Sequence, residues 1–487
     1  MSEHFDMLIV GAGLSGVDAA YRLKTKCPGK SWCILEARGV IGGTWDLFRY
    51  PGIRSDSDMY TLGFPFRPWR GDKAIAEGPH IRSYIEETAR EFGIDRNIRF
   101  RQRVVSASWS SAEQRWTLEV AADGENRRVT CAFLFLCSGY YRYDRGHSPS
   151  WPGEEDFRGA IVHPQLWPEN LDYRDRKIVV IGSGATAVTL VPALAEKASH
   201  VTMLQRSPSY IVSRPSRDKL ARRFGARFGR LKNAALGLVF FNLARRRPAK
   251  VRAKLLDLVR RDLPAGYDVE RHFGPNYDPW DQRLCLVPDG DLFEAIRGGK
   301  VAMATGEIER FTQGGIRLKS GEEVAADMVV TATGLVMKLM GGIALSVDGE
   351  PVNVAERFVY KGMMLDGVPN LALSFGYINA SWTLKCDLTA LHACRLLNFM
   401  DRRGHGWCVP RLPDPPPGRE PMLDFTSGYV RRAAGLLPAQ GDKAPWRVHQ
   451  NYFRDLLALR FGTLTDGVME FGSASSPPAL RRLHRSG

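Results

Sequence analysis

Short apolar runs alternate with an amphipathic stretch along the start of the chain. Residues 6–10 form an apolar run that ends at Gly11, residues 16–26 have the periodicity of an amphipathic helix, and residues 31–35 form a second apolar run. Buried parallel strands read as short continuous apolar runs, whereas amphipathic helices repeat about every 3.6 residues. The pattern predicts a strand–turn–helix–strand unit, the first half of a dinucleotide-binding fold.

The same order of runs returns in the middle of the chain. Residues 177–181 are apolar, residues 185–194 suit a helix, and residues 200–204 form another apolar run. The pattern also predicts a helix over 79–92 and further strands, which lie within 98–116, 133–137 and 328–331. The fold class is therefore predicted to be α/β, with two Rossmann-like dinucleotide-binding domains of the three-layer ββα type.

The turn after the first strand, GAGLSG, carries Gly11, Gly13 and Gly16. In such a turn the first glycine permits a tight bend, the second lets the backbone approach a pyrophosphate, and the third lets helix and strand pack closely. Glu36 follows 20 residues after Gly16, at the end of the second strand, where a carboxylate can bond ribose hydroxyls. These four residues are predicted to bind one dinucleotide.

The second turn, GSGATA, has Gly182, Gly184 and Ala187 at the matching positions. Beyond the next strand the chain reads Gln-Arg-Ser-Pro, with Arg206 and Ser207 where an acid would select NADH. A guanidinium can pair with the 2′-phosphate of NADPH, and a hydroxyl can hydrogen-bond to it. NADPH is therefore the predicted ligand of this unit. The alternative is that Arg206 is a solvated surface charge.

Positive charge is concentrated in one segment. The 487-residue chain has a formal net charge of +15, and residues 214–261 alone contain 16 Lys and Arg against two acids. The apolar centre of this segment, 233–244, indicates a helical basic insert over 214–270. Two interpretations of the insert stay open: a solvated helical face, or a hairpin peripheral to the anionic inner face of the cell membrane. No nucleic-acid-binding module accompanies the charge, so nucleic acid is not an expected partner.

The eight cysteines are scattered, without the spacing of a zinc site or a redox pair. We expect neutral or buried thiols and no metal. The chain starts directly with a strand instead of a secretory leader, and no stretch reaches the roughly 20 apolar residues of a membrane-spanning helix. A cytoplasmic protein is expected, with a poorly ordered end over 473–487.

A linker with the spacing FxGxxxHxxxWP joins the two glycine turns and contains Phe157, Gly159, His163 and Trp167. Between two nucleotide-binding turns, this motif resembles the fingerprint of the type I Baeyer–Villiger monooxygenases, which are class B flavoprotein monooxygenases. Further long motifs resemble the bacterial ethionamide-activating subgroup of that family; they lie at 49–64, 277–293 and 376–388. The resemblance implies that the linker couples the two nucleotide domains, and a purely structural role for His163 stays open.

The resemblance implies FAD in the first unit and NADPH in the second. Gly43, Thr44 and Trp45, in GGTW, look like a second flavin-contacting stretch, and a glycine pair lets backbone approach a flat ring or its phosphates. The expected domain order follows. An FAD-binding part over residues 1–150 is followed by the fingerprint linker over 151–170. An NADPH-binding domain with the insert covers 171–325, and a second FAD-binding part with the C-terminal region covers 326–487.

The resemblance also assigns the oxygen chemistry to Arg283 and Asp56. Arg283 matches the family arginine that sits over the flavin, and Asp56 matches the carboxylate that orients this arginine beside the cofactor. A guanidinium stays protonated and can stabilise a peroxide and a developing oxyanion. Asn379 and Trp382, in GYINASW, are implied to approach the flavin and the substrate; core packing is the alternative.

The implied function is that of an NADPH- and O2-dependent monooxygenase. It would convert ketones to esters or lactones through a C4a-peroxyflavin, with S-oxygenation of sulfides or thioamides beside that reaction. The alternatives are an enzyme that oxygenates only nitrogen or sulfur, and a non-catalytic flavin-binding sensor. A disulfide reductase is disfavoured because the cysteines lack a redox pair. The sequence leaves the substrate and the oligomeric state open.

Overall fold

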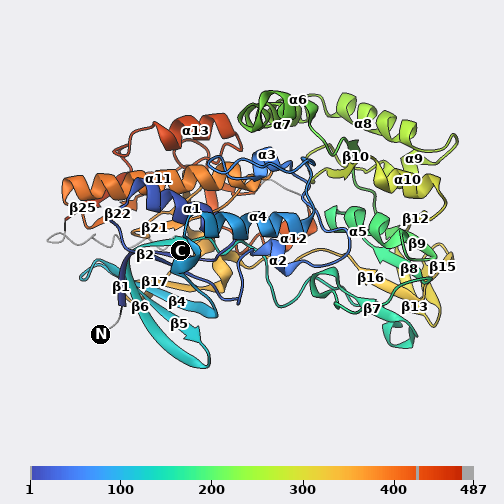
Figure 1. The fold of residues 1–487 in the computed structure, drawn as a ribbon, viewed down its shortest axis with the longest axis horizontal. Helices are drawn as coiled ribbons and strands as arrows, with labels where there is room; N and C mark the ends of the chain where they lie inside the picture. Colours follow the sequence, from blue (N-terminus) through green and yellow to red (C-terminus); the bar gives the residue numbers. More distant parts are fainter. Residues whose placement is uncertain (1–2, 424–426, 474–487) are drawn as a thin grey trace.

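Two sheets with parallel strands at their centres lie at opposite ends of the molecule in the computed structural model, which describes residues 3–423 and 427–473 (Figure 1). Each sheet contains the strand that leads into one of the two glycine turns, β1 (Glu3–Val10) or β8 (Lys177–Ile181), as the apolar runs predict. The α/β class with two Rossmann-like units is confirmed. The predicted disorder of 473–487 lies outside the described residues except for Ser473.

The first sheet has nine strands in the order β18-β17-β4-β5-β6-β1-β2-β3, with β21 paired to β6. Strand β1 pairs in parallel with β2 and β6, whereas β4, β5 and β6 form an antiparallel meander. The strands are β1 (Glu3–Val10), β2 (Trp32–Leu35), β3 (Ile98–Arg99), β4 (Gln102–Ser110), β5 (Arg115–Ala122), β6 (Glu125–Leu136), β17 (Ala344–Val347), β18 (Glu350–Pro351) and β21 (Leu371–Leu373).

Helices cover one side of the parallel strands of the first sheet, and the antiparallel β4–β5 ribbon of the same sheet folds over their other side (Figure 1). These helices are α1 (Leu14–Lys26), α4 (Gly78–Glu91) and α11 (Trp382–Arg403). Buried side chains of α1 and α11 share one core with the helix-facing side of β1. The second core lies between the sheet and the ribbon and includes Trp109 and Trp116. This arrangement agrees with the three layers that the sequence predicts.

The second sheet is parallel throughout, in the order β12-β9-β8-β16-β7. Its strands are β7 (Ala160–Val162), β8 (Lys177–Ile181), β9 (His200–Gln205), β12 (Val301–Thr305) and β16 (Met328–Thr331). Strand β7 comes from the fingerprint linker, and β16 follows residue 325, where the second domain was expected to end. The sheet therefore takes strands from both sides of the expected domain, whose exact limits stay a prediction.

Local pattern locates most elements to within two residues. The strands predicted over 177–181 and 328–331 coincide with β8 and β16. Helix α5 (Ala185–Ala195) also begins at the predicted residue. Helix α1 begins at Leu14 rather than Gly16, because Gly13 already serves as its N-cap.

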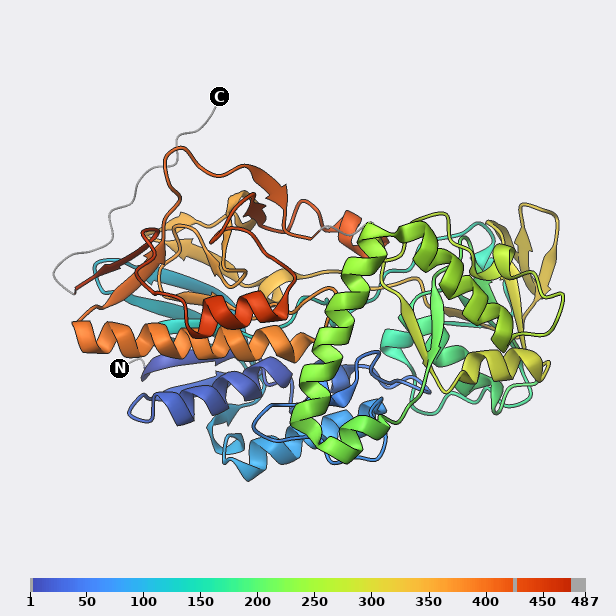
Figure 2. The same cartoon turned by 90° about the horizontal axis from the view of Figure 1, so that it is seen from above.

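The basic insert is helical, as predicted, with helices α6 (Lys219–Phe224), α7 (Ala226–Arg246), α8 (Pro248–Asp262) and α9 (Val269–Phe273). Helix α7 lies between the first lobe, which contains the nine-stranded sheet, and the second lobe, which contains the five-stranded sheet (Figure 2). Arg230 fixes it to the first lobe by donating to the carbonyl oxygens that end α3 (Met59–Leu62); the acceptors are those of Tyr60, Thr61 and Gly63, at 3.2, 3.1 and 2.8 Å. Among the described residues, no helix is long and apolar enough to cross a membrane.

All eight cysteines are buried and free, in agreement with the expected neutral thiols. Six of them lie in the sheet and helix cores of the first lobe; they are Cys27, Cys33, Cys131, Cys137, Cys394 and Cys408. Burial raises the pKa of the Cys285 thiol to about 12. These thiols therefore fill core space.

Candidate functional site

The first glycine turn leaves no space for side chains at its two ends. Gly11 has φ of +104°, and a Cβ on it would lie 2.7 Å from the carbonyl oxygen of Cys137. A Cβ on Gly16 would lie only 1.8 Å from the carbonyl oxygen of Gly11, so α1 can press against the turn only with glycine there. At Gly13 a Cβ would meet nothing closer than Gly43, at 3.6 Å. The turn is therefore open at its second glycine, toward the start of α1.

The Gly42–Gly43 loop lies directly on this turn. The Gly42 N–H donates to the carbonyl oxygen of Ala12 at 3.1 Å, and Gly43, with φ of +56°, is the N-cap of α2 (Thr44–Leu47). Thr44 starts that helix, and Trp45 packs against the first-lobe core. The predicted flavin-contacting stretch and the first glycine turn thus form one surface.

Glu36 lies at the end of β2 with its carboxylate engaged. One oxygen accepts the Ala12 N–H at 2.7 Å and the other accepts the Arg38 N–H at 2.8 Å. Burial raises the pKa of Glu36, and these two hydrogen bonds oppose the shift. The carboxylate holds the backbone of the glycine turn and remains beside it, where a ribose would be bound.

A buried carboxylate that the motif reading missed organises the same corner. Asp46 follows GGTW, has no exposed side-chain surface, and forms ion pairs with Arg38, Arg49 and Arg82. The Arg38 guanidinium also donates to the Gly43 carbonyl oxygen at 3.2 Å. Asp46 therefore helps to hold the Gly42–Gly43 loop in place through Arg38. The only signal in the sequence is its position directly after the GGTW motif.

The second glycine turn repeats the geometry with more room. Gly182 has φ of +137°, and its N–H donates to the Leu204 carbonyl oxygen at 2.8 Å. Gly184 is the N-cap of α5, without a side-chain cap, and a Cβ built on it would have nothing within 4 Å. Ala187 is buried in the first turn of α5. The N-terminus of α5 therefore offers N–H groups to an anion beside an open backbone.

Arg206 and Ser207 follow β9 at the carboxyl edge of the second sheet, and both are exposed. The Ser183 hydroxyl in the glycine turn donates to the Ser207 carbonyl oxygen at 3.1 Å, so the two segments lie side by side. The pKa of Glu307 is lowered by its hydrogen bond to Lys319 and, to a smaller extent, by the charge of Arg206, with which it forms no ion pair among the described residues. Arg206 is thus free to turn toward a ligand at this edge.

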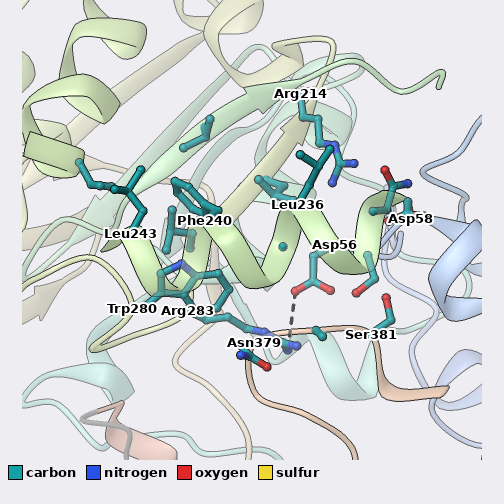
Figure 3. Close-up of a pocket in the computed structure, with 18 of the residues that line it drawn as sticks. Asp56, Asp58, Arg214, Leu236, Phe240, Leu243, Trp280, Arg283, Asn379 and Ser381 are labelled. Atoms are coloured by element: carbon teal, nitrogen blue, oxygen red, sulfur yellow. Dashed lines mark ion pairs between the residues drawn. The ribbon is translucent and has the colours of Figure 1, made fainter. Parts of the chain in front are cut away.

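Asp56 and Arg283 meet in a cavity of about 780 Å³ between the two lobes (Figure 3). The Arg283 Nη1 lies 3.6 Å from the Asp56 Oδ2, and the side chains remain 40% and 31% exposed because they line the cavity. The cavity volume lies within the range typical of small-molecule sites, about 300–1,000 Å³. The structure brings together two residues that are far apart in the chain.

The groups around Arg283 favour its positively charged form. The negative charge of Asp56 raises the pKa of Arg283, and the nearby hydroxyls of Tyr140, Tyr141 and Tyr429 act in the same direction. Burial in turn raises the pKa of Tyr140 to about 12, and its hydroxyl lies 2.8 Å from that of Tyr141. The sequence reading missed these tyrosines, because nothing in their spacing distinguishes them from core aromatics.

The GYINASW segment divides between the cavity and the core. Asn379 lines the cavity; its amide N–H₂ donates to the Gln450 carbonyl oxygen at 2.8 Å. Its side-chain oxygen is buried and, among the described residues, has no hydrogen-bond partner. Trp382 stacks on Tyr140 at 5.1 Å and donates to the Ser15 hydroxyl of α1 at 2.8 Å. The segment therefore links the cavity to the first glycine turn, and a polar group of a ligand could satisfy Asn379.

The fingerprint linker packs against the second lobe rather than the cavity. Phe157 lies against Phe311, and a Cβ on Gly159 would lie 2.2 Å from the Asp327 carbonyl oxygen. The His163 Nε2 lies 3.3 Å from the carbonyl oxygen of Gly334, in the segment that returns to the first lobe. Trp167 meets Tyr173 edge to face. None of the four linker residues is part of the cavity lining.

Helices α7 and α8 supply much of the cavity wall. The sequence did not predict this role for the insert. Leu236, Phe240 and Leu243 of α7 line the cavity together with Trp280 and Arg283 (Figure 3). Phe240 meets Trp280 edge to face, with ring centroids 6.4 Å apart. The apolar centre of the insert was visible in the sequence. That it covers the site could not be seen, because it depends on how the insert folds back over the second lobe.

Comparisons with known proteins agree with this architecture. The flavin-binding monooxygenase-like family matches residues 74–338, and an NAD(P)-binding Rossmann-like domain matches residues 9–71. The FAD-containing monooxygenase EthA of Mycobacterium tuberculosis is 54% identical, over 98% of this chain and 99% of its own length.

Two solved structures share the fold. A steroid monooxygenase in oxidised form bound to NADP superposes with a TM-score of 0.77 at 21% identity and covers 96% of this chain and 100% of its own. A polycyclic ketone monooxygenase from the fungus Thermothelomyces thermophila gives a TM-score of 0.74 at 18% identity, over 97% of this chain and 90% of its own. The extent of the family match and the identity to EthA show that the chain belongs to the flavin-binding monooxygenase family.

Proposed function

We propose that this flavin-binding monooxygenase uses FAD, NADPH and O2 to insert oxygen next to the carbonyl carbon of a ketone. The observation that carries the proposal is the Arg283–Asp56 pair, which lies in a ligand-sized cavity between the two lobes. The resemblance to Baeyer–Villiger monooxygenases and the fold shared with a polycyclic ketone monooxygenase support it.

The residues of the first turn fit FAD. Gly13 presents open backbone, the start of α1 has no side-chain cap, and Glu36 lies at the ribose position. Gly43, Thr44 and Trp45 would hold the part of the cofactor nearest the cavity. FAD, when bound, supplies the activation of O2 with electrons from NADPH. These cofactor assignments are part of the proposal.

The second turn fits NADPH. Gly184 leaves open backbone at the N-terminus of α5, where a pyrophosphate would accept backbone hydrogen bonds. Arg206 and Ser207 are exposed beside it, suited to a 2′-phosphate. We propose that the linker keeps the two lobes in a fixed relative position. Its four residues contact the second lobe and the segment that leads back to the first lobe; they are Phe157, Gly159, His163 and Trp167.

Arg283 has the charge and the exposure needed to stabilise negative charge on oxygen in the cavity. Its guanidinium presents several N–H donors, and charge stabilisation by such a donor is strongest where water is excluded. Asp56 limits the orientations that Arg283 can adopt. In the overall reaction one oxygen atom enters the bond between the carbonyl carbon and its neighbour, and the other leaves as water. NADPH and a proton supply the two electrons and two hydrogens.

The test of this proposal is product analysis with a panel of ketones and sulfides. We expect NADPH consumption to rise with a ketone and the product to gain one oxygen atom as an ester or lactone; thioether or thioamide S-oxygenation is expected as a side activity. Oxidation of sulfides and amines without any ester would support the heteroatom-only alternative. NADPH consumed solely to hydrogen peroxide would support a flavin-binding sensor.

The Arg283→Ala variant should lower kcat for ester formation by about 10²–10³, the effect of removing one donor to a developing oxyanion. Asp56→Asn should lower it less, because the guanidinium remains. Both variants are compared with Arg317→Ala, an exposed arginine of the second lobe, at equal FAD content. Ester formation by Arg283→Ala at the rate of the control would contradict the assignment.

We also propose that the outer face of α6 and α7 lies on an anionic bilayer. Phe224, Leu231 and Val239 are 58%, 56% and 64% exposed, and α6 and α7 also carry exposed arginines, among them Arg222, Arg223 and Arg227. Apolar side chains framed by cations suit the boundary between lipid headgroups and acyl chains. This face points away from the cavity, which Leu236 and Phe240 line.

Vesicle flotation tests this contact. The protein should float with vesicles that contain phosphatidylglycerol and not with neutral phosphatidylcholine vesicles. Leu231→Glu/Val239→Glu should abolish flotation, whereas Leu457→Glu, at an equally exposed leucine of α13 (Tyr452–Arg460), should not. Flotation that does not depend on lipid charge, or is lost equally in both variants, would rule out the contact.

A further inference from the structure

The cavity that holds Arg283 has a second, differently built part along the insert. Away from the Asp56–Arg283 pair, α7 and α8 line it with aliphatic side chains; these include Leu236, Leu243, Val251, Leu255 and Leu258. Such a wall favours an extended apolar group by removing it from water. A short polar ketone would leave most of this wall without contacts.

Four cations also line this cavity: Arg214 at the end of β10 (Ile211–Arg214), Arg247 at the junction of α7 and α8, and Lys250 and Lys254 on α8. Lys250 and Lys254 are one helical turn apart, so their side chains lie on the same face of α8. The cations therefore border the apolar wall instead of being scattered around the molecule.

The acidic groups of the cavity are engaged elsewhere. Asp56 pairs with Arg283, and Asp58 accepts hydrogen bonds from the N–H and hydroxyl of Thr61 at the start of α3. Lys254 has an acidic neighbour on its own helix, Asp257, at 3.5 Å. Within residues 3–423 and 427–473, Arg214, Arg247 and Lys250 have no carboxylate within ion-pair distance.

We infer that the cavity binds an amphiphile, with its reacting group at Arg283, its hydrocarbon chain along α7 and α8, and an anionic headgroup at Arg214, Arg247, Lys250 and Lys254. A carboxylate or phosphate there would relieve the repulsion among the cations and form charge-assisted hydrogen bonds. This inference deepens the proposed function, on which the identity of the reacting group rests. It names the substrate class as oxo or thia derivatives of long-chain acids.

Binding of unreactive amphiphiles tests the inference without turnover. Titration calorimetry of the FAD-loaded enzyme, first without NADP⁺ and then with saturating NADP⁺, compares dodecanoate, dodecyl phosphate and 1-dodecanol. We expect the two anions to bind at least tenfold more tightly than the alcohol, with a preference that weakens as salt is added. The stronger of the two anions identifies the headgroup. Equal affinity for the anions and the alcohol would overturn the inference.

Lys250→Gln/Lys254→Gln should reduce anion affinity about tenfold and leave 1-dodecanol binding unchanged. The matched control, Lys26→Gln/Lys443→Gln, removes the same charge at exposed positions outside the cavity and should keep the preference. Three results would overturn the inference: an equal loss in the control, displacement of dodecanoate by NADP⁺, or a loss confined to binding of phosphatidylglycerol vesicles. The second would assign the cations to the nicotinamide cofactor and the third to the bilayer.

Turnover separates this inference from the proposed function. A medium-chain oxo acid and its methyl ester are compared as substrates, and we expect kcat/KM to favour the acid about tenfold in the wild type and not in Lys250→Gln/Lys254→Gln. If neither compound is oxygenated while dodecanoate still binds through the two lysines, the ketone function fails and the anionic site stands. If both are oxygenated equally well in both proteins, the ketone function stands and the anionic site fails.

Discussion

The two glycine turns have the same backbone design, and their units contrast at the third small residue of the turn and after the second strand. At the third small residue the first turn has Gly16, where a Cβ would lie 1.8 Å from the Gly11 carbonyl oxygen, and the second has Ala187, whose methyl group is buried without conflict. In the first turn the helix is pressed against the backbone it follows. In the second the turn accommodates a buried methyl group at that position, so the same motif gives two different packing arrangements.

The second difference lies after the second strand of each unit. Glu36 is buried and bonded to the backbone of its own turn, whereas Arg206 is exposed at the sheet edge. The Glu36 carboxylate holds the backbone of the first turn, whereas the Arg206 side chain is available to a ligand. Equivalent positions of a repeated motif can therefore differ in burial and bonding: Glu36 supports its own turn beside the proposed ribose site, whereas we propose that Arg206 selects the nucleotide.

The largest effect is expected from Gly16→Ala. The added methyl cannot fit without moving α1 away from the turn, and overpacking of this kind destabilises by typically 1–3 kcal/mol and occasionally more. We expect roughly 3 kcal/mol of lost stability and loss of bound FAD, measured by urea unfolding and flavin absorbance. Normal FAD content in a stable Gly16→Ala protein would show that the first turn is not as tight as described.

Arg206→Ala should raise the KM for NADPH by roughly tenfold to a hundredfold and leave the KM for NADH nearly unchanged, since one charge-assisted contact to the 2′-phosphate contributes about 1.5–3 kcal/mol. Steady-state kinetics with both nucleotides checks this, with Arg317→Ala as the control. An equal change in the KM for NADH would mean that Arg206 is only a solvated surface charge. The contrast with Glu36 would then no longer hold.

His163→Ala should uncouple the two units by a few-fold, measured as NADPH oxidised per product formed. It removes the contact to the Gly334 carbonyl oxygen and the acceptor of the Gln165 N–H, at 3.3 and 3.1 Å. If coupling, rate and stability were all unchanged, the linker would not connect the units as proposed.

Burial also lowers the pKa of His163, so the imidazole is neutral in the fold at pH values where the unfolded chain begins to bind a proton. The contribution of His163 to stability is thus present above its unfolded pKa of about 6.5 and is lost as the pH falls below it. Unfolding midpoints of the wild type and His163→Ala should converge on acidification. Parallel profiles would contradict a neutral, buried imidazole.

The smallest effect is expected from Ala187→Gly. A glycine near the start of α5 should destabilise by about 1 kcal/mol through backbone entropy, without changing the KM for NADPH, because the turn already has space there. Thermal unfolding and NADPH kinetics measure both quantities. A loss as large as that of Gly16→Ala would mean that the two turns are equally tight.

Much of the fold could be read from local pattern. The strands at 177–181 and 328–331 were predicted to the residue, because each is a short apolar run bounded by turn residues. Asp56 and Arg283 could be named only through the resemblance, since no local pattern relates two residues so far apart. The roles of Asp46, Tyr140 and the α7–α8 wall could not be predicted, because burial and cavity lining depend on long-range packing.

Incubation under ¹⁸O2 shows whether the enzyme inserts an atom of molecular oxygen into a ketone. The wild type is incubated with NADPH, FAD and 2-dodecanone, and ester formation, NADPH consumption and isotope content are measured together. We expect close to one ester for each NADPH consumed, with one labelled oxygen atom in each ester, and little ester from Arg283→Ala. Ester without label, or NADPH consumption with peroxide as the sole product, would contradict this prediction.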